Sequence, residues 1–227
     1  MSKTTGTHLF EATGVTATMP QQGREDTIFK DLSFHVDAGE VVDLTGPSGA
    51  GKSTMLTAFA RLNTHTTGTF TLNGKDSDTF TPQQWRVHVS YLPQTSTLIG
   101  DTVADAIRLP WTFRVRQGQR RQSAKDLLTD EHIRELLDSM GCQDIGLERD
   151  PRDLSGGQAA RVCLARTILT KPDVLLADEV DAGLDETNAD KVADILKKAA
   201  ANGAAVVRVR HRAPDGRATR IMVLDHG

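Results

Sequence analysis

Residues 46–53 read Gly46-Pro47-Ser48-Gly49-Ala50-Gly51-Lys52-Ser53, which fits the phosphate-loop pattern of Gly, any four residues, Gly, Lys and Ser. The apolar run Val41–Thr45 comes directly before this stretch, and a helix is expected from Lys52 to about Leu62. In such a strand–loop–helix unit, glycines let backbone N–H groups curl around phosphate oxygens, and the helix N-terminus favours negative charge. The stretch therefore predicts a nucleoside triphosphate site on an α/β fold.

The loop and the start of its helix supply most of the predicted binding residues, namely Gly46, Pro47, Ser48, Gly49, Ala50, Gly51, Lys52, Ser53 and Thr54. Lys52 is expected to bridge the β- and γ-phosphates, and the Ser53 hydroxyl to bind Mg²⁺. A second apolar run, Val174–Asp178, indicates a buried strand that ends in two carboxylates, Asp178 and Glu179. Asp178 is expected to hold Mg²⁺ through water, and Glu179 to act as general base toward the attacking water.

The pentapeptide Leu154-Ser155-Gly156-Gly157-Gln158 stands where a helix is predicted to begin and run to about Thr170. Ser155 is placed to cap that helix, and the glycines leave its first N–H groups open to an anion. With this pentapeptide the chain resembles the ATP-binding cassette (ABC) ATPases over nearly its whole length. The resemblance implies that Ser155, Gly156, Gly157 and Gln158 of one subunit close over ATP held by the other, in a head-to-tail homodimer.

Four further positions are assigned by the same resemblance. Gln94, after Tyr91-Leu92-Pro93, matches a glutamine that contacts Mg²⁺. Asp185 matches the aspartate of a loop at the dimer interface, and His211 matches a histidine that contacts the γ-phosphate. Met19 stands where the family usually has an aromatic residue against adenine; a thioether can also pack on a base.

The organisation of the chain follows from the order of strand and helix signals. The resemblance implies an α/β P-loop NTPase fold of the ABC ATPase type, in a single domain spanning residues 1–227. Residues 1–94 and 154–227 are expected to form a nucleotide-binding core with a mainly parallel sheet and an N-terminal antiparallel β part. Two strands of that part, His8–Thr18 and Thr27–Val36, are expected to flank a polar loop with Pro20 and Gly23. Residues from about 95 to 153 carry helical signals and are expected to form an inserted lobe.

Composition excludes several classes of protein. The 227 residues carry a formal net charge of −3 and only 4% aromatic residues, so neither bulk positive charge nor base stacking favours nucleic-acid binding. No apolar run approaches the roughly 18–20 residues that cross a bilayer, and the N-terminus lacks the apolar segment of a secretory signal. Two cysteines, Cys142 and Cys163, fit two reduced thiols better than a disulfide framework. The chain is expected to be cytoplasmic and to reach the inner face of the membrane through a partner.

One stretch resembles a narrower group, the bacterial Fet-type iron-export ATPases. It comprises Thr97–Val103 and Leu109–Gln117, where a Pro-Trp pair and spaced arginines carry the likeness. The resemblance implies that this part of the lobe meets a separate membrane permease. Alternatively, Trp111 and Phe113 belong to the lobe core and the arginines form a solvated face. The stretch also has five cations and no acid between Arg114 and Lys125 (Arg114, Arg116, Arg120, Arg121 and Lys125), which suits anionic lipid headgroups.

Two functions remain open at this stage. The first is an ATPase subunit that powers a membrane transporter, with iron export as the narrower hypothesis. The second is a soluble ABC-type ATPase that acts on nucleic acid or the ribosome. That second class usually carries two cassettes or a long coiled coil, and the chain has one phosphate loop and no sustained heptads. A small-molecule P-loop kinase is disfavoured by the pentapeptide and Gln94.

Two charged residues fall in strands that should be apolar. Asp43 precedes the phosphate loop by three residues, and Arg208 precedes His211 by three. Because the two strands are expected to be neighbours in a sheet covered on both faces, a lone charge on either would be costly. We therefore predict a buried Asp43–Arg208 ion pair, with Arg210 as the alternative partner. Otherwise, Arg208 extends to solvent and Asp43 bonds a hydroxyl or water.

Overall fold

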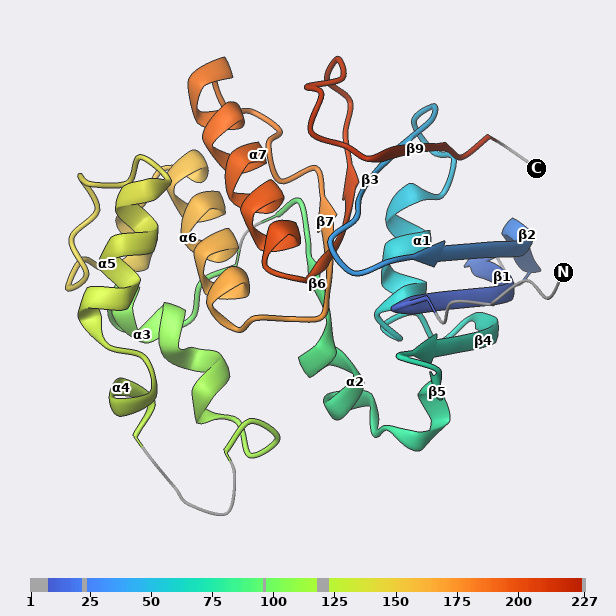
Figure 1. The fold of residues 1–227 in the computed structure, drawn as a ribbon, viewed down its shortest axis with the longest axis horizontal. Coiled ribbons are helices and arrows are strands. Elements are labelled where there is room, and N and C mark those ends of the chain that lie inside the picture. Colours follow the sequence, from blue (N-terminus) through green and yellow to red (C-terminus); the bar gives the residue numbers. More distant parts are fainter. Residues whose placement is uncertain (1–7, 22–23, 96, 118–122, 226–227) are drawn as a thin grey trace, which may run out of the picture.

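The structure is a computed structural model that describes residues 8–21, 24–95, 97–117 and 123–225. Within these residues the strands form two sheets, one parallel and one antiparallel, with helices on either side of the parallel sheet (Figure 1). This is the α/β architecture that the alternation of strand and helix signals predicts.

The parallel sheet contains the strands that carry the predicted nucleotide motifs. Its order is β6 (Val89–Leu92), β7 (Val174–Asp178), β8 (Ala205–Val209), β3 (Val41–Thr45) and β9 (Arg220–Val223). Every residue of β7 and β8 is buried, as expected for strands covered on both faces. The bounds predicted for β3 and β7 are confirmed. β9 was not predicted; its residues alternate between half-buried and exposed, as in a strand at the edge of the sheet.

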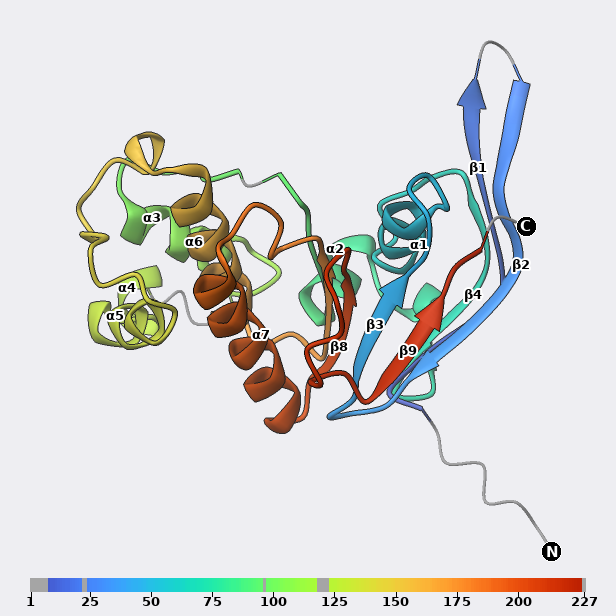
Figure 2. The same ribbon diagram turned by 90° about the horizontal axis from the view of Figure 1, so that it is seen from above.

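The antiparallel sheet has the order β2-β1-β4-β5. Its strands are β1 (Phe10–Gln21), β2 (Arg24–Val36), β4 (Thr66–Leu72) and β5 (Lys75–Asp76). Figure 2 shows the β1–β2 hairpin extending well beyond the rest of the molecule. The prediction that Pro20 lies in a loop was wrong, because β1 continues through Pro20, which pairs with Glu25. Gly23, placed in the same loop, lies outside the described residues.

Helices fill the space between the sheets and cover the far face of the parallel sheet. They are α1 (Lys52–Phe59), η1 (Ser77–Thr79), α2 (Pro82–His88), α3 (Val103–Arg108), η2 (Leu109–Thr112), α4 (Ala124–Leu127), α5 (Asp130–Ser139), η3 (Pro151–Asp153), α6 (Gly156–Leu169) and α7 (Glu186–Ala201). One core cluster joins both sheets around Phe59 of α1 and includes Leu176 of β7. A second cluster joins α5, α6 and α7 to the other face, where Leu175 of β7 points.

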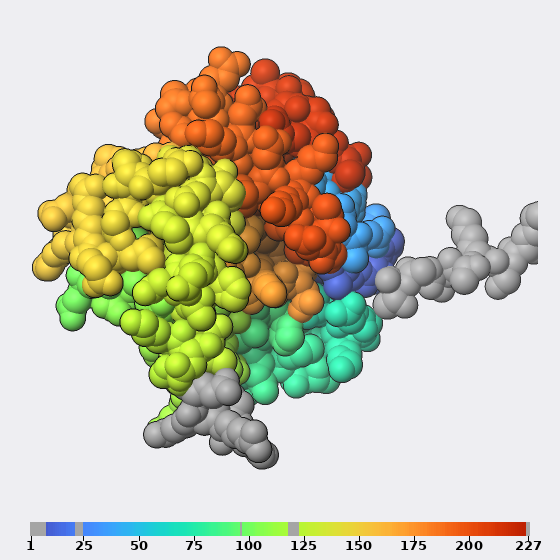
Figure 3. Space-filling view, turned by 60° about the vertical axis from the view of Figure 1, so that its left-hand side comes forward, coloured from blue at the N-terminus to red at the C-terminus, as the bar shows by residue number. Residues whose placement is uncertain are grey.

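Between β6 and α6 the described residues contain helices and no strand. α3 and α5 pack on α6, so that this part adjoins the parallel sheet through the helix that follows the pentapeptide. In the space-filling view these green-to-yellow residues gather on one side of the molecule, beside the orange residues of α7 (Figure 3). Arg120 and Arg121 of the basic stretch lie outside the described residues.

Candidate functional site

The phosphate loop curls around the side chain of Lys52. Lys52 is 6% exposed, and its ammonium donates to the carbonyls of Gly46 and Pro47, at 2.9 and 2.8 Å. Gly49 and Gly51 have φ of +82° and +91°, a backbone conformation that glycine adopts without strain. A Cβ on Gly51 would lie 2.6 Å from Ile28 of β2, so the antiparallel sheet packs directly against the loop. The loop thus presents N–H groups and a cation at the start of α1, which suits phosphate.

The other predicted loop residues lie as the motif requires. Pro47, Ser48 and Gly49 are exposed, Ala50 is buried, and Ser53 is exposed on the first turn of α1, beside half-buried Thr54. Met19 lies on β1 opposite Asp26 and is 44% exposed, on the sheet that packs against the loop. The exposed thioether therefore remains a candidate surface for a base, as the sequence predicts.

Glu179, Gln94 and His211 come together at the carboxyl ends of the parallel strands. The Gln94 amide donates to Glu179 Oε2 at 2.9 Å, and His211 Nε2 lies 2.8 Å from Glu179 Oε1. Glu179 itself has φ of +51°, which is uncommon for a residue with a side chain and is found where surroundings hold it in place. Three of the residues predicted from separate motifs are therefore joined in one hydrogen-bonded group.

Asp178 occupies the buried side of the same strand end. It is 3% exposed, and its Oδ2 accepts a hydrogen bond of 2.8 Å from the Tyr91 hydroxyl. Burial, followed by the hydrogen bond to Asp178, raises the Tyr91 pKa, so the phenol keeps its proton and remains a donor. Asp178 Oδ1 is buried and has no hydrogen-bond partner among the described residues. A buried carboxylate oxygen with a free lone pair fits a hard cation such as Mg²⁺.

The pentapeptide forms the start of α6. Ser155 Oγ accepts from the Gln158 N–H at 3.3 Å, and the Gln158 side chain accepts from the Ser155 N–H at 3.0 Å, which is a capping box. A Cβ on Gly156 would meet no atom within 4 Å, so the helix start faces open space. Figures 1 and 2 both place α6 and α1 on opposite sides of the parallel sheet.

Asp185 caps α7 on the loop that follows Glu179. Its carboxylate accepts from the Asn188 N–H at 2.9 Å and from the Asn188 side-chain amide at 2.5 Å. These hydrogen bonds lower the Asp185 pKa. Asn188 in turn accepts a 3.0 Å hydrogen bond from Arg161 of α6. The helix that starts at the pentapeptide is therefore connected to the loop of Asp185.

The predicted Asp43–Arg208 ion pair is present, and it belongs to a larger buried group. Arg208 donates from Nε and Nη2 to both oxygens of Asp43, at 2.5 and 3.2 Å. It also donates to both oxygens of Asp215, at 3.0 and 2.8 Å. Arg210, the alternative partner, lies 2.7 Å from Asp215 and donates to Asp181 at 3.2 Å. The sequence prediction missed Asp215 and Asp181, although two arginines on one strand face require more than one carboxylate.

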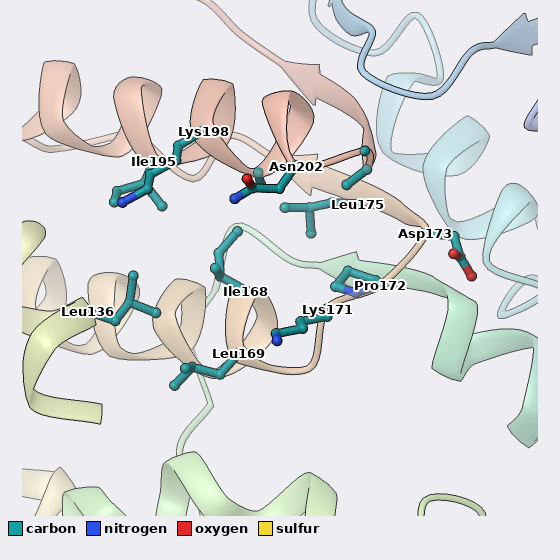
Figure 4. Close-up of a pocket in the computed structure, with 13 residues that line it drawn as sticks. Leu136, Ile168, Leu169, Lys171, Pro172, Asp173, Leu175, Ile195, Lys198 and Asn202 are labelled. Carbon is teal, nitrogen blue, oxygen red and sulfur yellow. The ribbon is translucent and has the colours of Figure 1, made fainter. Parts of the chain in front are cut away.

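Two hollows lie away from these residues. One, of about 530 Å³, is bordered by the ends of α6 and α7 and by Lys171, Pro172 and Asp173, which precede β7 (Figure 4). It therefore lies at the amino end of β7, whereas Asp178 and Glu179 stand at the carboxyl end. The other, of about 600 Å³, lies between α2, the segment after η2 and the end of α6. We call it the arginine groove, because Arg86, Arg114, Arg116 and Arg166 line it together with Phe113.

Comparison with known proteins agrees with this geometry. The profile of the ABC transporter family matches residues 29–182, which include the phosphate loop, Gln94, the pentapeptide, Asp178 and Glu179. The chain belongs to the ABC transporter family. It is an ABC ATPase cassette, built on the P-loop NTPase fold. His211 and Met19 lie outside the matched range, so their assignment rests on the structure and the sequence pattern.

Two relatives of this cassette are named for export. The Escherichia coli K12 protein named probable iron export ATP-binding protein FetA is 37% identical over 75% of this chain and 72% of its own length. The macrolide export ATP-binding/permease protein MacB of Salmonella choleraesuis is 32% identical over 90% of this chain, which spans only 31% of MacB. Both relatives therefore match the cassette, and MacB carries a long further part that the cassette does not cover.

Solved structures of ABC proteins have the same fold as this chain. The dimeric bacterial ABC transporter cassette MJ0796 superimposes with a TM-score of 0.80 at 26% identity, covering 96% of this chain and 95% of that one. A bacterial Atm1-family ABC exporter with ATP bound gives a TM-score of 0.78 at 26% identity, covering 97% of this chain and 37% of the exporter. Within the described residues of the cassette, no helix is both long and apolar enough to cross a bilayer.

Proposed function

We propose that this cassette is the ATP-hydrolysing subunit of an exporter whose permease is a separate chain, and that it works as a head-to-tail homodimer. The observation that carries the proposal is the group formed by Glu179, Gln94 and His211, at the edge of the parallel sheet where β3 also leads into the phosphate loop. A carboxylate, an amide and an imidazole at this edge are the groups that hydrolysis of a loop-bound ATP would use. We also propose that residues 1–94 and 154–227 form the nucleotide-binding core and about 95–153 the inserted lobe.

Binding of the triphosphate would use the loop residues in the roles that their chemistry allows. The N–H groups of the loop and the start of α1 offer donors to phosphate oxygens, and Lys52 offers a point charge. Ser53, Gln94 and Asp178 would hold Mg²⁺, which neutralises charge on the phosphate oxygens when it is bound. Tyr91 supports this assignment, because it fixes the Asp178 carboxylate through one oxygen and leaves the other unpaired.

Glu179 is the group that would accept a proton from the attacking water. Each of its carboxylate oxygens makes one hydrogen bond, to Gln94 or His211, and keeps a lone pair for a further donor. Such a carboxylate can orient water and take its proton as the bond to the γ-phosphorus forms. His211 would then stand close enough to donate to a γ-phosphate oxygen.

A homodimer is proposed because one chain supplies only half of each site. The start of α6 is exposed and open, α6 and α1 lie on opposite sides of the parallel sheet, and the free N–H groups of α6 suit a phosphate brought by a second copy. Dimerisation of the similar cassette MJ0796 supports this arrangement. In it, Ser155 and Gly156 of one subunit would complete the site that Lys52 and Glu179 of the other begin.

The arginine groove is the proposed docking surface for the permease. Its four arginines are accompanied by no carboxylate among the described residues that line it, and Phe113 beside them is 52% exposed. We therefore propose that it receives an acidic and partly apolar cytoplasmic segment of the permease. Iron is proposed as the cargo on the strength of the similarity to FetA alone.

Purification with the partner tests the function as a whole. The tagged chain should be isolated from cells of its source with a polytopic membrane protein and without RNA or DNA, and cells that lack it should accumulate iron. Isolation with ribosomes or nucleic acid instead would support the soluble class of ABC ATPase and contradict the proposal.

A further inference from the structure

The loop that follows Glu179 is attached to the strand end that carries His211. Arg210, the residue before His211, donates from Nε to Asp181 Oδ2 at 3.2 Å. Arg212, the residue after His211, donates to the carbonyl of Leu184. His211 itself contacts Glu179. Three consecutive residues after β8 therefore contact three points of residues 179–184.

The contact between Arg210 and Asp181 is made in the protein interior. The two side chains are 7% and 11% exposed, and Arg210 also lies 2.7 Å from Asp215. A buried carboxylate without a cationic partner is strongly disfavoured, so Asp181 and Arg210 hold each other. Because Asp181 lies only two residues beyond Glu179, its contact with Arg210 also restrains the backbone that follows Glu179.

Glu179 needs such support. Its φ of +51° is sparsely populated for a residue with a side chain and persists where neighbouring contacts determine it. The Ala182 N–H donates to the Glu179 carbonyl at 2.9 Å, and the Leu184 N–H donates to the Asp181 carbonyl at 3.3 Å. The loop is thus a compact turn whose orientation is set by the side chains that hold it from outside.

We propose that Arg210 and Arg212 are positioning residues that hold residues 180–184 against the His211 segment, with Asp181 as the carboxylate of this clamp. The clamp keeps Glu179 oriented toward the attacking water and Asp185 at the dimer interface. The inference rests on the proposed roles of Glu179, His211 and the dimer. It goes beyond those roles, because it assigns a function to Arg210, Arg212 and Asp181, which do not contact the reacting atoms.

The test compares two carboxylates of the same buried group. Asp181→Asn removes the charge that holds the loop. Asp43→Asn removes a charge that is bonded to Arg208, lies 3.9 Å from Arg210 and does not contact the loop. Both variants keep the size of the side chain and leave each arginine with Asp215. The measurements are kcat, the ATP dissociation constant, the melting temperature and, in the Glu179→Gln background, dimer formation with ATP.

We expect Asp181→Asn to lower kcat at least about tenfold while the ATP dissociation constant changes by less than about twofold, because a small displacement of a catalytic group is costly. Dimer formation with ATP should weaken in the same variant. Asp43→Asn should lower the melting temperature at least as much and keep kcat within about twofold at temperatures well below unfolding. A purely structural group would not separate the two variants in this way.

The clamp is overturned if Asp181→Asn keeps kcat, or if both variants lose kcat equally. If Asp181→Asn does not fold, Arg212→Gln is measured instead, because Arg212 is exposed and its replacement should not prevent folding. Arg212→Gln should lower kcat and leave ATP binding unchanged. A wild-type kcat in this variant would overturn the clamp. Failure of the proposed function would give a different result from failure of the clamp. In that case the wild-type cassette would show no ATPase activity, or Glu179→Gln would stay active.

Discussion

Arg208 on β8 and Asp43 on β3 form an ion pair inside the parallel sheet, with Arg208 Nε 2.5 Å from Asp43 Oδ1. The two residues are directly opposite each other in the register of the strands. Their side chains are 3% and 5% exposed, so neither charge is compensated by water. The pair therefore joins two neighbouring strands of the parallel sheet.

Removing one partner of this pair should destabilise the fold. We expect Arg208→Ala to cost about 3–5 kcal/mol of unfolding free energy, because Asp43 stays buried without the arginine that binds both its oxygens. Asp43→Ala should cost less, because Arg208 keeps its hydrogen bonds to Asp215. The double variant should cost clearly less than the sum, since each single change already removes the interaction. Urea denaturation of the four proteins measures this coupling, and additive losses would contradict an energetic pairing.

The Asp43–Arg208 pair could be predicted from the sequence for two reasons. The apolar runs that became β3 and β8 were recognisable, and their common end at the catalytic edge set Asp43 and Arg208 at one level. Asp215 could not be found in that way, since it lies beyond β8 on a connection with no periodic pattern. Its position depends on how the chain returns to β9, which is a tertiary property.

In the candidate site too, some residues could be predicted from the sequence and others could not. The motif residues were predictable because phosphate and water chemistry requires particular side chains at short spacings. Tyr91, Asp181 and Arg212 were not, because each depends on a contact between residues remote in sequence: Tyr91 with Asp178, Asp181 with Arg210, and Arg212 with the Leu184 carbonyl.

Acid should weaken the buried group through Asp215. Burial raises the pKa of this carboxyl, but the hydrogen bonds from Arg208 and from the Arg217 N–H outweigh burial, so its pKa lies below the ordinary aspartate value. A carboxyl with a lowered pKa in the folded state stabilises the fold above its unfolded pKa of about 3.9 and loses that contribution as the pH falls through its folded pKa.

We therefore expect the unfolding free energy of the wild type to fall with pH below about 4, and Asp215→Asn to be less stable at pH 7 with a shallower decline. Urea denaturation across this range measures both. Asp78→Asn is the control, since the Asp78 side chain is 86% exposed and should leave the profile unchanged. An Asp215→Asn profile parallel to the wild type would exclude Asp215 as a source of the acid sensitivity.

Glu179→Gln should stop turnover and preserve nucleotide binding. The amide keeps hydrogen bonds with Gln94 and His211 but cannot take a proton from water. ATP should then hold the dimer together, since it is not cleaved. Size-exclusion chromatography with light scattering should detect a dimer with ATP and a smaller species with ADP. Turnover at the wild-type rate would show that another group acts as the base.

Mixing two inactive variants tests whether Ser155 acts on the opposite subunit. Lys52→Ala removes the loop cation and Ser155→Ala removes the α6 cap, and each alone should be nearly inactive. In a mixed dimer, one site combines intact Lys52 of one chain with intact Ser155 of the other. At equal amounts and random pairing, about a quarter of the wild-type rate should return. If activity does not return although the variants form mixed dimers, Ser155 works within its own chain and the head-to-tail arrangement is wrong.

The arginine groove should bind the permease through Phe113 and Arg114, whereas Trp111 should contribute to folding. Trp111 is half-buried against the core of α5 and α6, while Phe113 is 52% exposed and Arg114 is exposed. We expect the double variant Phe113→Ser, Arg114→Glu to weaken association with the permease at least about tenfold, since it removes an apolar contact and reverses a charge facing an acidic segment. Its melting temperature and ATP binding should stay at wild-type values, while Trp111→Ala should lower the melting temperature.

Lys30→Glu, an exposed charge reversal on β2, is the control and should bind the permease normally. Normal association of the double variant, measured by co-purification in detergent at two salt concentrations, would remove the groove as the docking surface.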